Sequence, residues 1–340
     1  LEASRLLGTV TRESMQAARA TLAKLLEREN DTIELEYSSI GHSHLDLIFL
    51  WPERETIRKG ARTYSTALYL MEKYPFYKFG CSQPQIYVWM REHYPSIYKR
   101  IRERVKEGRW ECQGCFWVEM DTNLPAGESL VRQILYGKRF FMDEFGKEMK
   151  VGFLPDVFGY SAALPQLLVK SGTPYFMTQK LSMNDTNRFP RHTFLWKGID
   201  GSEVLTHMLP EDSYNSAAVP QMAIYGLHHY TDLDRCGEAL QLYGIGDGGG
   251  GPGYEHLERI KRQKNLKGVP PLRPEFCIDF FERINRKRDT YRKWVGELYF
   301  ERHQGTYTSI AKGKMYNRLM EIKLHHTEWL YTLAALRLGT

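Results

Sequence analysis

The sequence predicts an α/β protein in which a mostly parallel sheet, most simply a barrel, is surrounded by helices. Short apolar runs typical of strands alternate with longer segments in which apolar residues recur at helical spacing. Three acid-bearing motifs, which contain His44 with Asp46, Asp156 and Asp247, each follow such an apolar run. Parallel strands gather ligands at their carboxyl ends, and a barrel is the simplest fold that brings distant strand ends together.

The elements are expected in a regular order. An amphipathic helix over 5–29 has a broad apolar stripe, and Pro52 opens a second helix that Pro75 stops. A third helix runs from about 87 to 108 with an interruption at Pro95, and a fourth covers 129–145. Strands are expected at 33–40, 77–81, 110–112, 151–154, 175–177, 193–196, 204–208 and 242–245.

Composition excludes several classes of function. The net charge of +6 is small for 340 residues and lysine and arginine are mixed with acids, so a nucleic-acid partner is not expected. No apolar run is long enough for a membrane span, and the first residues lack the apolar core of a signal peptide, so a cytoplasmic location is expected. Five scattered cysteines argue against a disulfide framework. The sequence is also compatible with a homo-oligomer.

The pentapeptide His42-Ser-His-Leu-Asp46 predicts a metal site at the end of the first strand. In extended backbone, side chains two residues apart share a face, so His42, His44 and Asp46 can converge on one point. Imidazole and carboxylate are ordinary zinc ligands. The alternative interpretation, in which the histidines only satisfy polar groups at a strand end, stays open from the pentapeptide alone.

Asp156 and Asp247 are the other candidate acids. A pair of carboxylates facing one substrate is typical of glycoside hydrolysis, whereas a metal held between carboxylates is typical of a metallohydrolase. Asp156 after a strand would also suit a helix cap, and Asp247 within a glycine run would also suit a turn. The residues alone leave these alternatives open.

Six blocks of sequence, in one order along the chain, resemble the α-mannosidases of glycoside hydrolase family 38, and the resemblance runs from about His42 to the end. The blocks are GHSHLDLIFLWP (41–52), FWVEMDTNLPAGES (116–129), LPDVFGYS (154–161), TQKLS (178–182), GIGDGGGGP (244–252) and GTYTS (305–309).

The resemblance implies a seven-stranded (β/α) barrel-like catalytic domain, of the type shared with carbohydrate deacetylases, that is followed by the start of a helical bundle. It implies one Zn²⁺ ion held by His44, Asp46 and Asp156, with His42 behind these ligands. It also implies that Asp156 is the nucleophile and Asp247 the general acid/base of a retaining α-mannosidase that acts on mannose-containing oligosaccharides through a covalent mannosyl-aspartate. Lys180 is expected to border the substrate and keep Asp156 ionised, with an exposed surface lysine as its alternative.

Two departures from the family pattern carry expectations of their own. Relatives place a tryptophan under the sugar where this chain has Phe49, so a smaller aromatic platform for the substrate is expected. Relatives also supply a later histidine ligand, for which neither His325-His326 nor His228-His229 fits. The expected domains are a linker helix (1–31), the barrel (32–300) and a truncated helical bundle (301–340), with metal binding and turnover impaired. The alternatives are a metal-dependent carbohydrate deacetylase or an inactive sugar-binding fragment.

Overall fold

The computed structural model describes residues 8, 10–28, 30 and 33–339. Its helices are α2 (Arg12–Leu26), α3 (Glu53–Lys73), α4 (Pro84–His93), α5 (Pro95–Lys106), α6 (Gly127–Phe145), α7 (Leu164–Lys170), α8 (Pro220–His229), α9 (Tyr254–Gln263), α10 (Cys277–Ile284), α11 (Gly305–Thr308) and α12 (Ala311–Leu338). Its strands are β1 (Glu36–His42), β2 (Phe79–Cys81), β3 (Trp110–Cys112), β4 (Val151–Leu154), β5 (Tyr175–Thr178), β6 (Thr193–Lys197), β7 (Glu203–Met208), β8 (Glu238–Tyr243), β9 (Leu272–Pro274) and β10 (Lys293–Val295).

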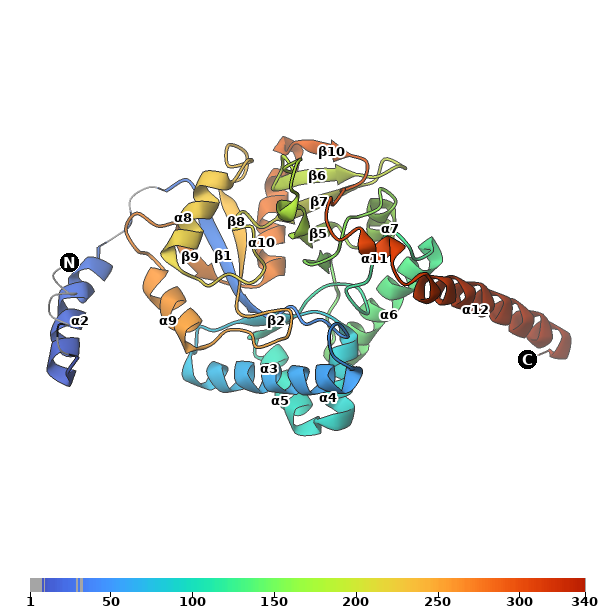
Figure 1. Ribbon diagram of the computed structural model, residues 1–340, viewed down its shortest axis with the longest axis horizontal. Helices are drawn as coiled ribbons and strands as arrows, with labels where there is room; N and C mark the ends of the chain where they lie inside the picture. The colour runs from blue at the N-terminus through green and yellow to red at the C-terminus, as the bar shows by residue number, and fades with distance from the viewer. Residues whose placement is uncertain (1–7, 9, 29, 31–32, 340) are drawn as a thin grey trace.

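The strands lie in two neighbouring sheets, with helices outside them (Figure 1). One sheet has the order β3-β2-β1-β8, with β9 paired to the beginning of β1, and the other has the order β10-β6-β7-β5-β4. All pairs are parallel except β6 with β7. The α/β class and the parallel sheet that the sequence predicts are confirmed.

The two sheets meet along two seams and together form a barrel-like wall. At one seam Gly114, just after β3, lies against Phe153 of β4. At the other, the amide of Leu240 in β8 donates to His207 Nε2 in β7 over 3.1 Å. The seven strands β1, β2, β3, β4, β5, β7 and β8 therefore follow each other around the wall in chain order, as the expected barrel requires. Strands β6, β9 and β10 lie outside this series of seven strands, and the sequence did not predict that position.

Prolines and glycines set most helix ends where the sequence places them. Pro52 precedes α3, and Pro95 separates α4 from α5. The last predicted strand, 242–245, is shifted: β8 ends at Tyr243 because the positive φ of Gly244 turns the chain, and Ile245 is 59% exposed. The first strand is likewise shifted to 36–42 and includes His42.

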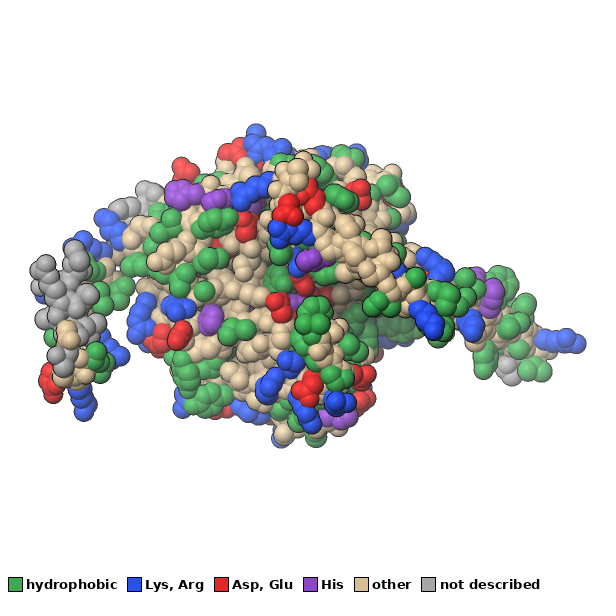
Figure 2. Space-filling view, viewed as in Figure 1, with side chains coloured by type: hydrophobic (Ala, Val, Ile, Leu, Met, Phe, Trp, Pro, Cys, Tyr) green, Lys and Arg blue, Asp and Glu red, His purple; other side chains and the backbone are tan. Residues whose placement is uncertain are grey.

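Helices α2 and α12 lie outside the barrel (Figure 1). The predicted helix over 5–29 appears as α2, and its residues 5–7, 9 and 29 are outside the described residues. Helix α12 projects from the body, with hydrophobic side chains along it, including Leu319, Trp329 and Leu336, open to solvent (Figure 2). Its assignment to a bundle, like the domain boundaries, stays a prediction. Within the described residues no helix combines the length and apolar character of a membrane span.

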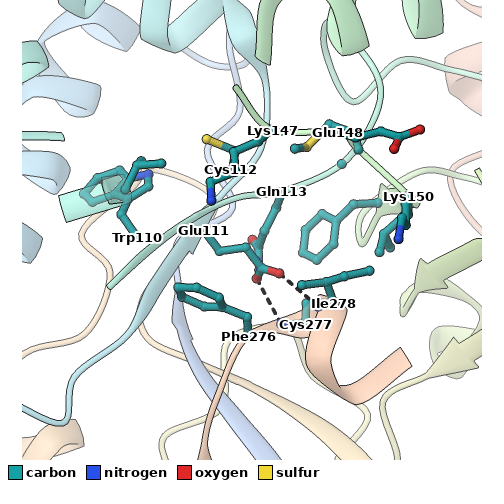
Figure 3. Close-up of a pocket in the computed structure, with 15 residues that line it drawn as sticks. Trp110, Glu111, Cys112, Gln113, Lys147, Glu148, Lys150, Phe276, Cys277 and Ile278 are labelled. Atoms are coloured by element: carbon teal, nitrogen blue, oxygen red, sulfur yellow. Dashed lines mark hydrogen bonds between the residues drawn. The ribbon is translucent and has the colours of Figure 1, made fainter. Parts of the chain in front are cut away.

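Glu111 of β3 joins the first sheet to α10. Its carboxylate accepts hydrogen bonds from the amides of Cys277 and Ile278 at the start of that helix, beside a cavity of about 130 Å³ (Figure 3). Burial raises the pKa of Glu111 to about 7, against the lowering effect of these amides. The folded protein therefore holds a proton here that an unfolded chain releases near pH 4.5.

We expect Glu111→Gln to remove one component of the pH dependence of stability. Between about pH 4.5 and about pH 7 the folded state binds the extra proton, so the wild type loses free energy of unfolding as pH rises through this window. From the lower to the upper end of this pH window, the free energy of unfolding of the wild type should fall by up to about 3 kcal/mol relative to that of the variant. Denaturant unfolding at several pH values measures this difference, with the exposed Glu103→Gln as control. A difference that stays constant with pH would contradict the expectation.

Candidate metal and carboxylate site

Three side chains from the predicted motifs lie together at the carboxyl ends of β1 and β4. His44 and Asp46 follow β1, and Asp156 follows β4. Their ligand atoms lie within 4.8 Å of one another, and His44 Nε2 is 3.5 Å from both Asp46 Oδ1 and Asp156 Oδ2. One imidazole and two carboxylates thus converge on one point, and they are the three residues that the family resemblance names as metal ligands.

The environment of His44 fits a divalent cation. Its Nε2 atom is buried and has no hydrogen-bond partner. Burial lowers the pKa of His44, but the carboxylates of Glu119, Asp156 and Asp46 outweigh burial and raise this pKa well above its usual value. The position therefore favours positive charge, which a metal ion also provides, and the nitrogen and oxygen donors suit zinc.

His42 does not join this group. The chain leaves β1 after His42, so the two-residue periodicity expected across the pentapeptide does not continue and the three-way convergence is wrong. The His42 ring packs against Phe153 with the ring centres 5.2 Å apart, and its Nδ1 atom is 3.3 Å from the Gly80 carbonyl oxygen. Burial and the nearby His44 lower the pKa of His42 to about 3, so it is neutral. Asp156 takes the third position instead.

Asp156 is held as an anion. Lys180 forms an ion pair with its Oδ1 atom, and the Tyr214 hydroxyl donates to the same oxygen over 2.8 Å. Burial acts to raise the pKa of Asp156, but His44 and Lys180 outweigh it and lower the pKa to about 2. Lys180 is only 6% exposed, so its interpretation as a surface lysine is wrong. Asp156 lies in a turn well before α7, so it does not cap that helix.

Asp247 is placed beside Asp156 by a turn and by one tyrosine. Its backbone is left-handed, with φ 58°, within the glycine run after β8. Its carbonyl oxygen accepts a hydrogen bond from the Asp46 amide over 2.9 Å. The Tyr214 hydroxyl is 3.0 Å from Asp247 Oδ1, so one hydroxyl contacts both candidate acids. The turn interpretation and the acid interpretation of Asp247 are therefore compatible.

A cleft of about 220 Å³ opens over His44, Asp46 and Asp156, whereas Asp247 and Lys180 are not among its lining residues. Glu119, Asp121, Phe158 and Tyr307 line it together with the three convergent residues. Tyr307 belongs to α11, so the segment after residue 300 contributes to the cleft. Phe49 is not among the lining residues: it is 64% exposed and packs edge-on against Trp51 with the ring centres 6.0 Å apart.

Sequence reasoning missed several residues of this site, including Glu119, Tyr214 and Tyr307. Glu119 lies 2.8 Å from His44 Nδ1, and both Glu119 and Tyr307 stand inside blocks that carry the family resemblance, which was the available signal. Tyr214 has no such signal, since it lies in the loop after β7 outside every block. Among the described residues neither His228-His229 nor His325-His326 belongs to the ligand group. All five cysteines are buried and free.

Comparisons with known proteins give sequence matches over most of the chain. The model of the "glycosyl hydrolases family 38 N-terminal domain" matches residues 34–297. The chain is 48% identical to α-mannosidase G of Dictyostelium discoideum over 90% of this chain and 28% of that protein. It is 42% identical to human α-mannosidase 2C1 over 96% of this chain and 31% of that protein.

A solved structure is similar in fold. The crystal structure of an α-mannosidase from Enterococcus faecalis V583 superposes with a TM-score of 0.66 at 18% identity, over 78% of this chain and 31% of that one. The chain thus spans less than a third of the length of these relatives.

Proposed function

This chain belongs to the glycosyl hydrolases of family 38, and from that premise we propose that it forms the catalytic barrel of a zinc-assisted, retaining α-mannosidase. The substrate class is a mannose-containing oligosaccharide or glycan. The relatives' names support the activity, and the convergent side chains of this chain support the mechanism.

The contact of Tyr214 with two carboxylates is the observation that carries the proposal. Asp156 Oδ1 and Asp247 Oδ1 lie 2.8 and 3.0 Å from one hydroxyl oxygen. These carboxylate oxygens are therefore separated by ~6 Å at most, which is close to the roughly 5–5.5 Å of retaining glycosidases and below the wider gap that an inverting enzyme needs for its water. This spacing supports Asp156 as the nucleophile and Asp247 as the acid/base of a retaining reaction.

The Tyr214 hydroxyl lies between the two candidate acids. A tyrosine hydroxyl has one proton to donate, and burial followed by the charges of Asp156 and Asp247 raises the pKa of Tyr214, so it stays protonated. That proton can be donated to Asp156 Oδ1 or to Asp247 Oδ1, because both oxygens lie within hydrogen-bond distance of the hydroxyl. In the proposed mechanism Asp156 is the nucleophile and Asp247 takes the role of general acid.

The reaction then proceeds in two steps. An Asp156 oxygen forms a bond to the anomeric carbon while the bond to the leaving oxygen breaks, and Asp247 gives that oxygen its proton. Water next attacks the anomeric carbon, its proton returns to Asp247, and the bond to Asp156 breaks. Two displacements at one carbon give net retention.

His44, Asp46 and Asp156 would hold the ion. When bound, zinc supplies a Lewis acid that orients adjacent sugar hydroxyls. Lys180 and Tyr214 keep the charge of Asp156 in place. The cytoplasmic location, the homo-oligomer and the platform role of Phe49 stay predictions.

The test is hydrolysis of an aryl α-mannoside by the complete gene product, with metal removed and restored. We expect a chelator to lower kcat/KM at least ~100-fold and Zn²⁺ to restore it, because without the ion no Lewis acid orients the sugar hydroxyls beside Asp156. Proton NMR of the first product should show the α anomer. Undiminished activity after verified metal removal would contradict zinc assistance, and an initial β anomer would contradict retention.

A further inference from the structure

Gln83 adopts a backbone conformation that its residue type rarely takes. It precedes α4 with φ 66° and ψ 84°, and the next residue is Pro84. Left-handed backbone is unfavourable for a residue with a β-carbon unless its surroundings fix it, and such residues gather at functional sites. Gln83 is also only 3% exposed, so its polar side chain is buried along with this backbone. Both costs need a compensating interaction.

The Gln83 carboxamide joins the two segments that surround His44. Its Nε2 atom donates to the carbonyl oxygen of Leu45, which lies between the two ligands of the β1 motif, over 2.9 Å. Its Oε1 atom accepts from the amide of Glu119 over 3.1 Å. The ligand loop and the Glu119 loop, from distant parts of the sequence, are therefore fixed relative to each other by one side chain.

Ser82 and Glu119 complete the arrangement. Ser82, 3% exposed, donates through Oγ to Glu119 Oε1 over 2.5 Å. The other oxygen of that carboxylate lies 2.8 Å from His44 Nδ1. A metal-binding histidine is oriented by a carboxylate at its second nitrogen, which also sets the tautomer. With Nδ1 facing Glu119, His44 Nε2 is left for Asp46, Asp156 and the ion.

We propose that Ser82, Gln83 and Glu119 form a clamp that positions His44 for the metal, with Gln83 as its central positioning residue. The inference rests on the metal site of the proposed function. The carboxylate sets the direction of the imidazole ring, Ser82 sets the direction of the carboxylate, and Gln83 sets the distance between the two loops. Loss of any member frees His44 to rotate away from the ion.

The experiment measures metal affinity of Gln83→Met, which keeps the size of the side chain and removes both hydrogen bonds. The dissociation constants for Zn²⁺ and Co²⁺ are determined by competition with a chromophoric chelator on the metal-free complete gene product. We expect affinity to fall about 10- to 100-fold. The matched control is Gln85→Met on the same helix, whose side chain instead accepts from the indole of Trp117 over 3.1 Å, and its affinity should equal that of the wild type.

A second pair of variants separates positioning from folding. Glu119→Gln keeps an oxygen facing His44 Nδ1 and should restore most of the affinity that Glu119→Ala loses, and the Co²⁺ absorption spectrum should change only in the alanine variant. If Gln83→Met fails to fold, the comparison of the two Glu119 variants still tests whether the clamp positions His44. Equal metal affinity of wild type and folded Gln83→Met, or of the two Glu119 variants, would overturn the clamp and leave the metal site standing. A wild type that binds neither ion would overturn both the clamp and the zinc part of the proposed function.

Discussion

Asp156→Ala is expected to lower kcat for aryl α-mannosides by roughly 10⁴- to 10⁶-fold, the range seen when a nucleophile is removed. Asp156 would form the bond to the sugar and also bind the metal, so alanine removes two functions at once. It also leaves Lys180, 6% exposed, without the carboxylate that neutralises it. The measurement is single-turnover and steady-state kinetics on the complete gene product.

Mass spectrometry of a trapped intermediate provides the control for this prediction. A fluorinated mannosyl substrate that reacts quickly in the first step and slowly in the second should label the wild type on the peptide that contains Asp156, and should leave the alanine variant unlabelled. Asp200→Ala, an exposed turn residue, should keep full activity and labelling. A wild type that turns over without any sugar adduct would point to the deacetylase-type chemistry, in which water is the nucleophile.

We expect the loss of rate caused by Asp247→Ala to depend on the leaving group of the substrate. Removal of a general acid lowers the rate by about 10²- to 10⁴-fold. The loss should be large for a mannoside with a poor leaving group, which needs the proton, and small for a dinitrophenyl mannoside, which departs without it. Formation of the intermediate is then fast with the activated substrate and its hydrolysis becomes slow, so added azide should accelerate turnover.

The comparison of substrates is the decisive control for Asp247. Because Tyr214 contacts Asp247 and Asp156 together, a disturbed tyrosine would slow all substrates alike. An equal loss across the leaving-group series would therefore show that Asp247 acts through Tyr214 and Asp156, and the acid/base assignment would be wrong. Circular dichroism of the variant checks that the glycine-rich turn still folds.

The strand ends were predictable because proline and glycine mark them in the sequence. Pro155 follows β4 and a glycine run follows β8, so Asp156 and Asp247 could be placed at one edge of the sheet. The placement of His44 beside Asp156 follows from the same rule. The ligand group could thus be predicted from periodicity, ligand chemistry and the resemblance together.

Tyr214 and Gln83 were not predictable in this way. Tyr214 lies in a loop, and no spacing rule connects it to carboxylates on two other loops. The importance of Gln83 depends on its left-handed backbone and on contacts with Leu45 and Glu119, which exist only in the folded chain. His42 shows the opposite error, since a local periodicity was extended beyond the end of the strand that produces it.

The backbone hydrogen bond between the Asp46 amide and the Asp247 carbonyl ties two loops that belong to different motifs. This bond belongs to an isolated antiparallel bridge between Leu45 and Gly248, which pairs the two loops beside Asp46. An insertion or deletion that shifts one of these loops would displace the other, and with it the side chains of Asp46 and Asp247 together. A change of loop length is therefore expected to disturb these side chains less at α11, which takes no part in the bridge.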